Sequence, residues 1–131
     1  MTTILICWTI GVLLPYIWAG ASVPFRSRQF GTVDLKTPRL QGEQMTEGGA
    51  RAVGAQGNAW EALIVFSVAN VAAIWAGADP SGTWSTLAIV WVVARILHGV
   101  FYLTDVAVGR IAAFVTGFVM SLWILSQAFT V

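Results

Sequence analysis

The chain has 131 residues, of which 57% are hydrophobic and only 10% are charged, and its mean hydropathy is +0.77. A soluble domain usually carries about 25% charged residues, so this composition excludes an ordinary soluble domain and indicates an integral membrane protein. The formal net charge is +1 and there is no basic stripe or nucleic-acid motif, so we expect no nucleic-acid partner. With one His and one Cys the chain has too few ligands for a zinc site, and we expect no metal.

A first membrane-spanning helix is predicted over about residues 3–22. No charged side chain occurs before Arg26, and the apolar run is long enough to cross a bilayer core at about 1.5 Å per residue. A signal peptide is the alternative, because Ala-Gly-Ala at 19–21 resembles a cleavage site, but no basic residue precedes the run. We therefore expect a retained helix that is kinked at Pro15.

A long polar segment over 23–49 is predicted to be a loop on the membrane surface, because it is rich in Gly and Pro. Three further helices are predicted over about 50–76, 83–103 and 110–129. A turn at 77–82 and a short connection at 105–110 separate them. The expected fold is an all-α integral membrane protein, a four-transmembrane-helix bundle that forms a single domain over 1–131 in the lipid bilayer.

The basic residues predict how this bundle is oriented. Apart from one inside the third helix, they lie in or beside the first and third connections: Arg26, Arg28, Lys36, Arg39, Arg51 and Arg110. Because loops rich in Lys and Arg remain in the cytoplasm, we expect both connections there and both termini on the non-cytoplasmic side. The membrane would be the inner or plasma membrane if the protein is bacterial. The tryptophans are expected mainly as anchors at the membrane–water interface.

Two of the predicted helices carry polar side chains on one face each: Arg51, Asn58 and Glu61 on the second, and Arg95, His98 and Tyr102 on the third. Such groups cost roughly 2–4 kcal/mol each within a span, so they are normally kept for binding or pairing. Their spacings place both faces at matching depth in adjacent antiparallel helices. Glu61 and Arg95 are therefore predicted partners, because either alone would be an uncompensated charge. A structural ion pair and a ligand-binding role both remain open for them.

Together the two polar faces would form a pocket. Its residue types suit a small zwitterion with carboxylates and an amine. Arg51, Arg95 and Arg110 offer cations for the carboxylates, and Glu61 offers an anion for the amine. Gln56 and Asn58 add amide groups. The adjacent bilayer would admit a lipophilic small molecule as second substrate.

Two stretches resemble motifs of the MAPEG family, the membrane-associated proteins in eicosanoid and glutathione metabolism. These are AQGNAWE at 55–61 and ARILHGVFY at 94–102, which is followed by Arg110. The resemblance implies a left-handed four-helix bundle assembled as a homotrimer, with glutathione as co-substrate between subunits on the cytoplasmic side. It implies that glutathione is contacted by Gln56, Asn58, Glu61 and Tyr102. From the two polar faces we add Arg51, Arg95 and His98 as expected glutathione-binding residues. Arg110 matches, within one residue, an arginine that stabilises the glutathione thiolate, so it is the expected catalytic residue.

Three positions depart from the family pattern. Gly54 stands where an arginine usually precedes the Ala-Gln pair, Ala62 where Asn or Tyr commonly follows the glutamate, and His98 where several members have tyrosine. The main hypothesis is a glutathione-dependent transferase or peroxidase acting on lipophilic electrophiles. Its alternatives are a non-catalytic binding or structural protein with a degenerate glutathione site, and a small multidrug-type transporter that uses a membrane-buried glutamate.

Overall fold

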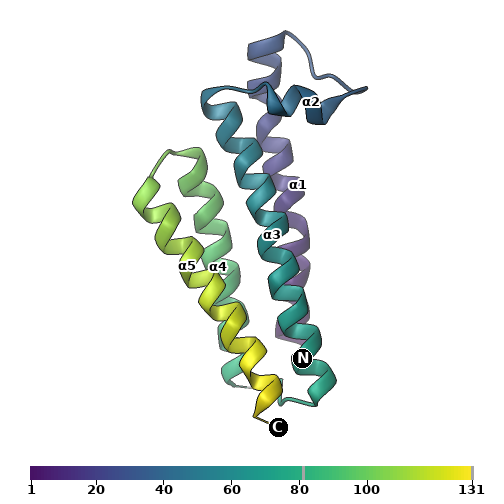
Figure 1. The fold of residues 1–131 in the computed structure, drawn as a ribbon, viewed down its shortest axis with the longest axis vertical. Helices are drawn as coiled ribbons and strands as arrows, with labels where there is room; N and C mark the ends of the chain where they lie inside the picture. Colours follow the sequence, from purple (N-terminus) through teal and green to yellow (C-terminus); the bar gives the residue numbers. More distant parts are fainter. Residues whose placement is uncertain (81, 131) are drawn as a thin grey trace.

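The computed structural model describes residues 1–80 and 82–130, and in this part of the chain all regular secondary structure is helical (Figure 1). The elements are α1 (Thr2–Phe30), α2 (Pro38–Glu43), α3 (Glu47–Ala76), α4 (Thr83–Leu103), α5 (Ala107–Ser126) and a closing 3₁₀ turn, η1 (Gln127–Phe129). Four helical segments are long and apolar enough to cross a membrane: α1, α3, α4, and α5 with η1. The predicted all-α, four-span membrane architecture is confirmed.

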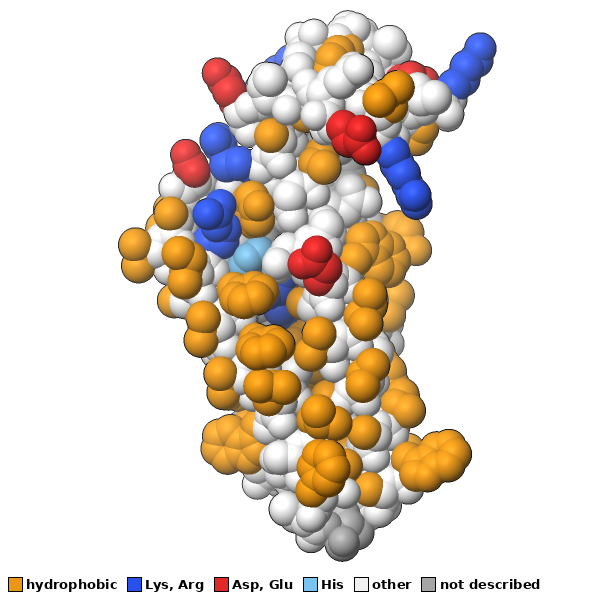
Figure 2. All heavy atoms as spheres, viewed as in Figure 1, with side chains coloured by type: hydrophobic (Ala, Val, Ile, Leu, Met, Phe, Trp, Pro, Cys, Tyr) orange, Lys and Arg blue, Asp and Glu red, His pale blue; other side chains and the backbone are white. Residues whose placement is uncertain are grey.

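The four long helices run up and down, and both termini lie at the same end (Figure 1). In the ribbon α1 packs along α3, α4 packs along α5, and α2 lies across the opposite end. Most of the charged side chains gather toward the end that carries α2, whereas the other half of the visible face is hydrophobic (Figure 2). The end that carries α2 therefore holds the polar features predicted for one side of the membrane.

The boundary predicted for the first helix is wrong, because α1 continues from residue 22 to Phe30. The segment predicted as a loop over 23–49 is also partly helical, since it contains the end of α1, all of α2 and the start of α3. Arg26 lies in this extension, and its Nη1 donates to the Pro38 carbonyl oxygen at 2.7 Å and to Gln41 Oε1 at 3.1 Å. These bonds hold α2 against the end of α1. Gly31 then ends α1 with φ of +75°.

The other helix boundaries differ by a few residues from those predicted. α3 begins at Glu47 and α5 at Ala107, each three residues earlier than expected, while α4 has the predicted bounds. The first turns of both early-starting helices include glycine, which weakens the sequence signal for a helix.

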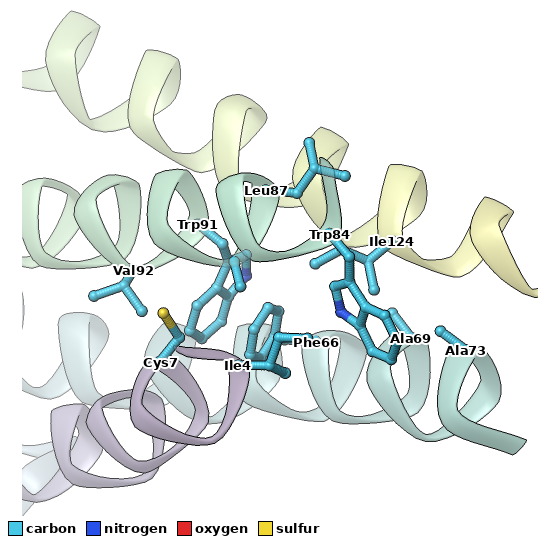
Figure 3. Close-up of a cluster of buried hydrophobic side chains, with 11 residues drawn as sticks. Ile4, Cys7, Phe66, Ala69, Ala73, Trp84, Leu87, Trp91, Val92 and Ile124 are labelled. Atoms are coloured by element: carbon cyan, nitrogen blue, oxygen red, sulfur yellow. The ribbon is translucent and has the colours of Figure 1, made fainter. Parts of the chain in front are cut away.

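A large cluster of buried hydrophobic side chains lies toward the end opposite α2, where Trp91 and Phe66 stack with ring centroids 3.8 Å apart (Figure 3). Nearby, the indole Nε1 of Trp84 donates to Asn70 Oδ1 at 2.8 Å, so Asn70 links two helices as expected for membrane bundles. Trp84 and Trp91 are each only 1% exposed. The expectation that tryptophans anchor at the interface is therefore wrong for these two, because they fill the space between helices.

Candidate functional site

Arg95 on α4 is buried and reaches across to α3, where its Nη2 donates to Asn58 Oδ1. The same Nη2 lies 3.3 Å from His98 Nδ1, one turn further along α4. These contacts bring the two predicted polar faces together at the depth that the helical rise indicated. The buried polar centre is thus an arginine held between an amide and an imidazole.

Glu61 lies on the same side of α3 but does not form the predicted ion pair with Arg95. The ion pair found among the described residues joins Arg51 and Asp105, and Glu61 is in none. Its side chain is exposed and lines the mouth of a cavity that Arg95 also lines. The prediction was wrong because Asn58, one turn closer to the α2 end, reaches the guanidinium first.

Tyr102 lies in the last turn of α4, and three neighbours fix its ring. The Arg110 guanidinium carbon of α5 lies 4.5 Å from the ring centroid. The His98 ring packs edge-on with centroids 5.5 Å apart. On the third side is Gly54 of α3, where a Cβ would lie 2.5 Å from the phenol oxygen. Among the described residues the Tyr102 hydroxyl makes no hydrogen bond, so it is available to a ligand.

Gly54 therefore has a structural role that its place in the motif does not reveal. The arginine expected there would have its Cβ in the space that the Tyr102 hydroxyl occupies. Only a residue without a Cβ lets this phenol lie directly against α3. Tyr102 thus fills the position from which the expected arginine would extend.

Arg51 of α3 has a carboxylate partner that the sequence did not suggest, because its Nη1 lies 3.6 Å from Asp105 Oδ2. Asp105, in the short connection between α4 and α5, has a φ of +61°, which is unusual for a residue with a Cβ. Sequence reasoning missed Asp105, although its place just after α4, level with the start of α3, was a usable signal. This ion pair fastens α3 to the α4–α5 connection.

Gln56 faces away from the other predicted ligand-binding residues. It lines a separate cavity of about 520 Å³ between α1, α2 and α3, together with Arg26, Arg39 and Glu43. Arg26 is 8% exposed and is a second buried arginine that the sequence analysis assigned only to a loop. The fold of this chain therefore does not bring Gln56 together with Asn58, Glu61 and Tyr102.

The fold and site together define a four-helix integral membrane protein with a cationic, partly buried polar cluster near the α2 end of its α3–α4–α5 face. Three arginines and two carboxylates contribute to this cluster, which leaves one net positive charge: Arg51, Arg95, Arg110, Glu61 and Asp105. The MAPEG family model matches residues 3–130, and the chain belongs to this family. No curated protein and no solved structure matches the chain.

Proposed function

We propose that this MAPEG protein is a glutathione-dependent transferase or peroxidase that acts on lipophilic electrophiles and works as a homotrimer. The observation that carries the proposal is the Arg110 guanidinium held 4.5 Å from the ring of Tyr102, whose hydroxyl has no partner among the described residues. A fixed cation lowers the pKa of a neighbouring thiol and so increases the fraction of nucleophilic thiolate. Tyr102 adds a hydrogen-bond donor beside it.

The two reactions use this thiolate differently. In a transferase reaction the thiol loses its proton, and the sulfur forms a bond to the electrophilic carbon of the second substrate. The bond from that carbon to its leaving group breaks and the group departs with the electron pair, or the π bond of an activated alkene opens and takes up the proton. In a peroxidase reaction two glutathione molecules are oxidised to the disulfide, while a hydroperoxide is reduced to an alcohol and water. Glu61 would pair with the glutathione amine, and the net positive charge of the cluster favours binding of the glutathione carboxylates.

The trimer explains why Gln56 lies apart from the other residues. If glutathione lies between subunits, the α1–α2–α3 cavity with Gln56, Arg26 and Arg39 of one subunit would face the Tyr102 side of its neighbour. Site residues that are separated in one chain would then meet across the interface. Native mass spectrometry of the detergent-solubilised protein tests the assembly: a dominant trimer supports this arrangement, and a monomer that still binds glutathione contradicts it.

Titration calorimetry with glutathione tests the site. We expect micromolar-to-millimolar binding to the wild type and a tenfold or greater loss in Glu61→Gln, roughly the value of one charge-assisted contact. Glu47→Gln on the same helix is the matched control and should bind as the wild type does. Arg110→Ala should lower turnover with a model electrophile more than it lowers glutathione affinity. Equal, negligible effects of the Glu61 and Arg110 variants would refute the assigned roles.

A non-catalytic binding protein is the second candidate, and Gly54 is the observation that favours it. Loss of an arginine contact to a glutathione carboxylate would cost roughly 1.5–3 kcal/mol, or about ten- to a hundredfold in affinity. No glutathione binding up to about 10 mM, a free energy weaker than about −3 kcal/mol, would select this candidate over the enzyme.

A further inference from the structure

Asp105, in the connection between α4 and α5, stands at a backbone position that normally favours glycine. Its φ is +61°, in the left-handed region, and the amide of Val106 donates to the carbonyl oxygen of Phe101 at 2.9 Å. Helices often end in a hydrogen-bonded turn of this kind, and its left-handed residue is usually glycine, which has no Cβ. The ending of α4 thus gives no reason for a carboxylate at this position.

The Asp105 side chain instead finds a partner on the helix opposite. Its Oδ2 lies 3.6 Å from Arg51 Nη1 on α3, and among the described residues it forms no ion pair with Arg110, which follows five residues later. This distance exceeds the range of about 2.7–3.2 Å for a hydrogen bond, so Asp105 compensates the charge of Arg51 without occupying its donors. The Arg51 side chain is 33% exposed and makes no hydrogen bond in the described part of the chain. A second anion can therefore reach Arg51, and Asp105 would compete with it electrostatically.

The Arg51–Asp105 pair lies close to the Tyr102 hydroxyl, on the side of the α2 end. Arg51 precedes Gly54 by three residues on α3, and Asp105 follows Tyr102 by three residues. Gly54 and Tyr102 are in contact, because a Cβ on Gly54 would lie 2.5 Å from the phenol oxygen. Three residues of helix amount to about one turn, so a thiol compound bound at Tyr102 and Arg110 would have this ion pair as its neighbour.

We propose that Asp105 is a specificity-determining residue: by compensating Arg51, it lowers the preference of the site for a thiol with two carboxylates over a thiol with one. The charges of the polar cluster support this role. Its three arginines and two carboxylates leave one net positive charge, which matches an aminothiol with one carboxylate and an ionised thiol. Glutathione with an ionised thiol carries two net negative charges, which the cluster would match only without Asp105. The inference rests on the proposed function, because it concerns the co-substrate of the same site.

Asp105→Asn tests this role, because asparagine also adopts the left-handed conformation and the variant therefore removes the charge while keeping the turn. Titration calorimetry compares glutathione with two analogues, in each of which one of its two carboxylates is converted to an amide. We expect the variant to bind glutathione about two- to fivefold more tightly than the wild type does, as for the loss of an exposed ion pair. One of the two analogues, the one without the carboxylate that approaches Arg51, should bind both proteins equally.

Two further variants separate this role from a structural one. Glu47→Gln removes an exposed carboxylate at the start of α3 and should leave all three affinities unchanged. In an Arg51→Gln background, Asp105→Asn should no longer strengthen glutathione binding, because its effect acts through Arg51. The inference is overturned if Asp105→Asn leaves the glutathione affinity unchanged or lowers it, raises the affinity of both analogues equally, or still raises the glutathione affinity without Arg51.

The same titrations distinguish this inference from the proposed function. If the wild type binds glutathione but Asp105→Asn binds it no more tightly, the inference alone is refuted. If neither protein binds glutathione or its analogues up to about 10 mM, a free energy weaker than about −3 kcal/mol, the proposed function is refuted together with the inference.

Discussion

Replacement of Asn58 by Ala provides the sharpest test of how the buried polar centre is held together. In the structure Asn58 Oδ1 accepts from Arg95 Nη2, while the Arg95 Nε already lacks a partner. The variant would leave this buried guanidinium with only the 3.3 Å contact to His98. A hydrogen bond to a charged group contributes about 1.5–3 kcal/mol, so we expect the free energy of unfolding to fall by about that amount.

Glu61→Gln is the informative comparison, because the sequence alone assigned the partnership with Arg95 to Glu61. The structure places the Glu61 side chain on the surface and in no ion pair. Its neutralisation should therefore cost less than about 1 kcal/mol, the usual value for an exposed charged group. Gln56→Ala, which removes a half-buried amide of the same helix, serves as control and should stay within about 0.5 kcal/mol of the wild type.

Equilibrium unfolding in mixed micelles, at a series of sodium dodecyl sulfate fractions, measures these free energies without ligand. The loss in free energy of unfolding should be much larger for Asn58→Ala than for Glu61→Gln, and it should be near zero for Gln56→Ala. If Glu61→Gln costs 3–5 kcal/mol, the value for breaking a buried ion pair, and Asn58→Ala costs less than 0.5 kcal/mol, the assignment of Asn58 as the partner is refuted.

Two further predictions follow from local geometry. Gly99→Ala should lower the free energy of unfolding by about 1–3 kcal/mol, because its Cβ would overlap the Trp18 ring. Gly20→Ala, whose Cβ would meet nothing within 4 Å, should instead stabilise α1 by about 0.5–1 kcal/mol, and equal effects of the two would contradict the packing seen here. Near α2, hydrogen bonds from the Thr37 hydroxyl and backbone amide lower the pKa of Asp34, so these bonds are present above the ordinary Asp pKa and are lost as the pH falls through the lowered value. An NMR titration of the Thr37 amide should show this transition below the ordinary value and lose it in Asp34→Asn; a transition at or above the ordinary value would contradict the assignment.

The four membrane spans were determined by the sequence itself. An apolar run long enough for the bilayer core has few alternatives to a helix, because lipid leaves no partner for a free backbone N–H or C=O. The helical spacing also placed Arg95, His98 and Tyr102 on one face without knowledge of neighbours. These are local properties, and the sequence contains the information for them.

The ends of the helices and the partners of the buried charges were decided by tertiary structure. α1 extends to Phe30, and Arg26 within this extension bonds to acceptors on α2, twelve and fifteen residues away along the chain. The opposite charge of Glu61 predicted it as the partner of Arg95. A side chain can bond only to a group that the helix packing brings within reach, and for Arg95 that group is Asn58. Likewise, the role of Gly54 becomes visible only when the Tyr102 phenol of another helix is seen to occupy the space beside it. Spacing along one helix fixes which side chains share a face, whereas the distance between faces is set by how all four helices pack.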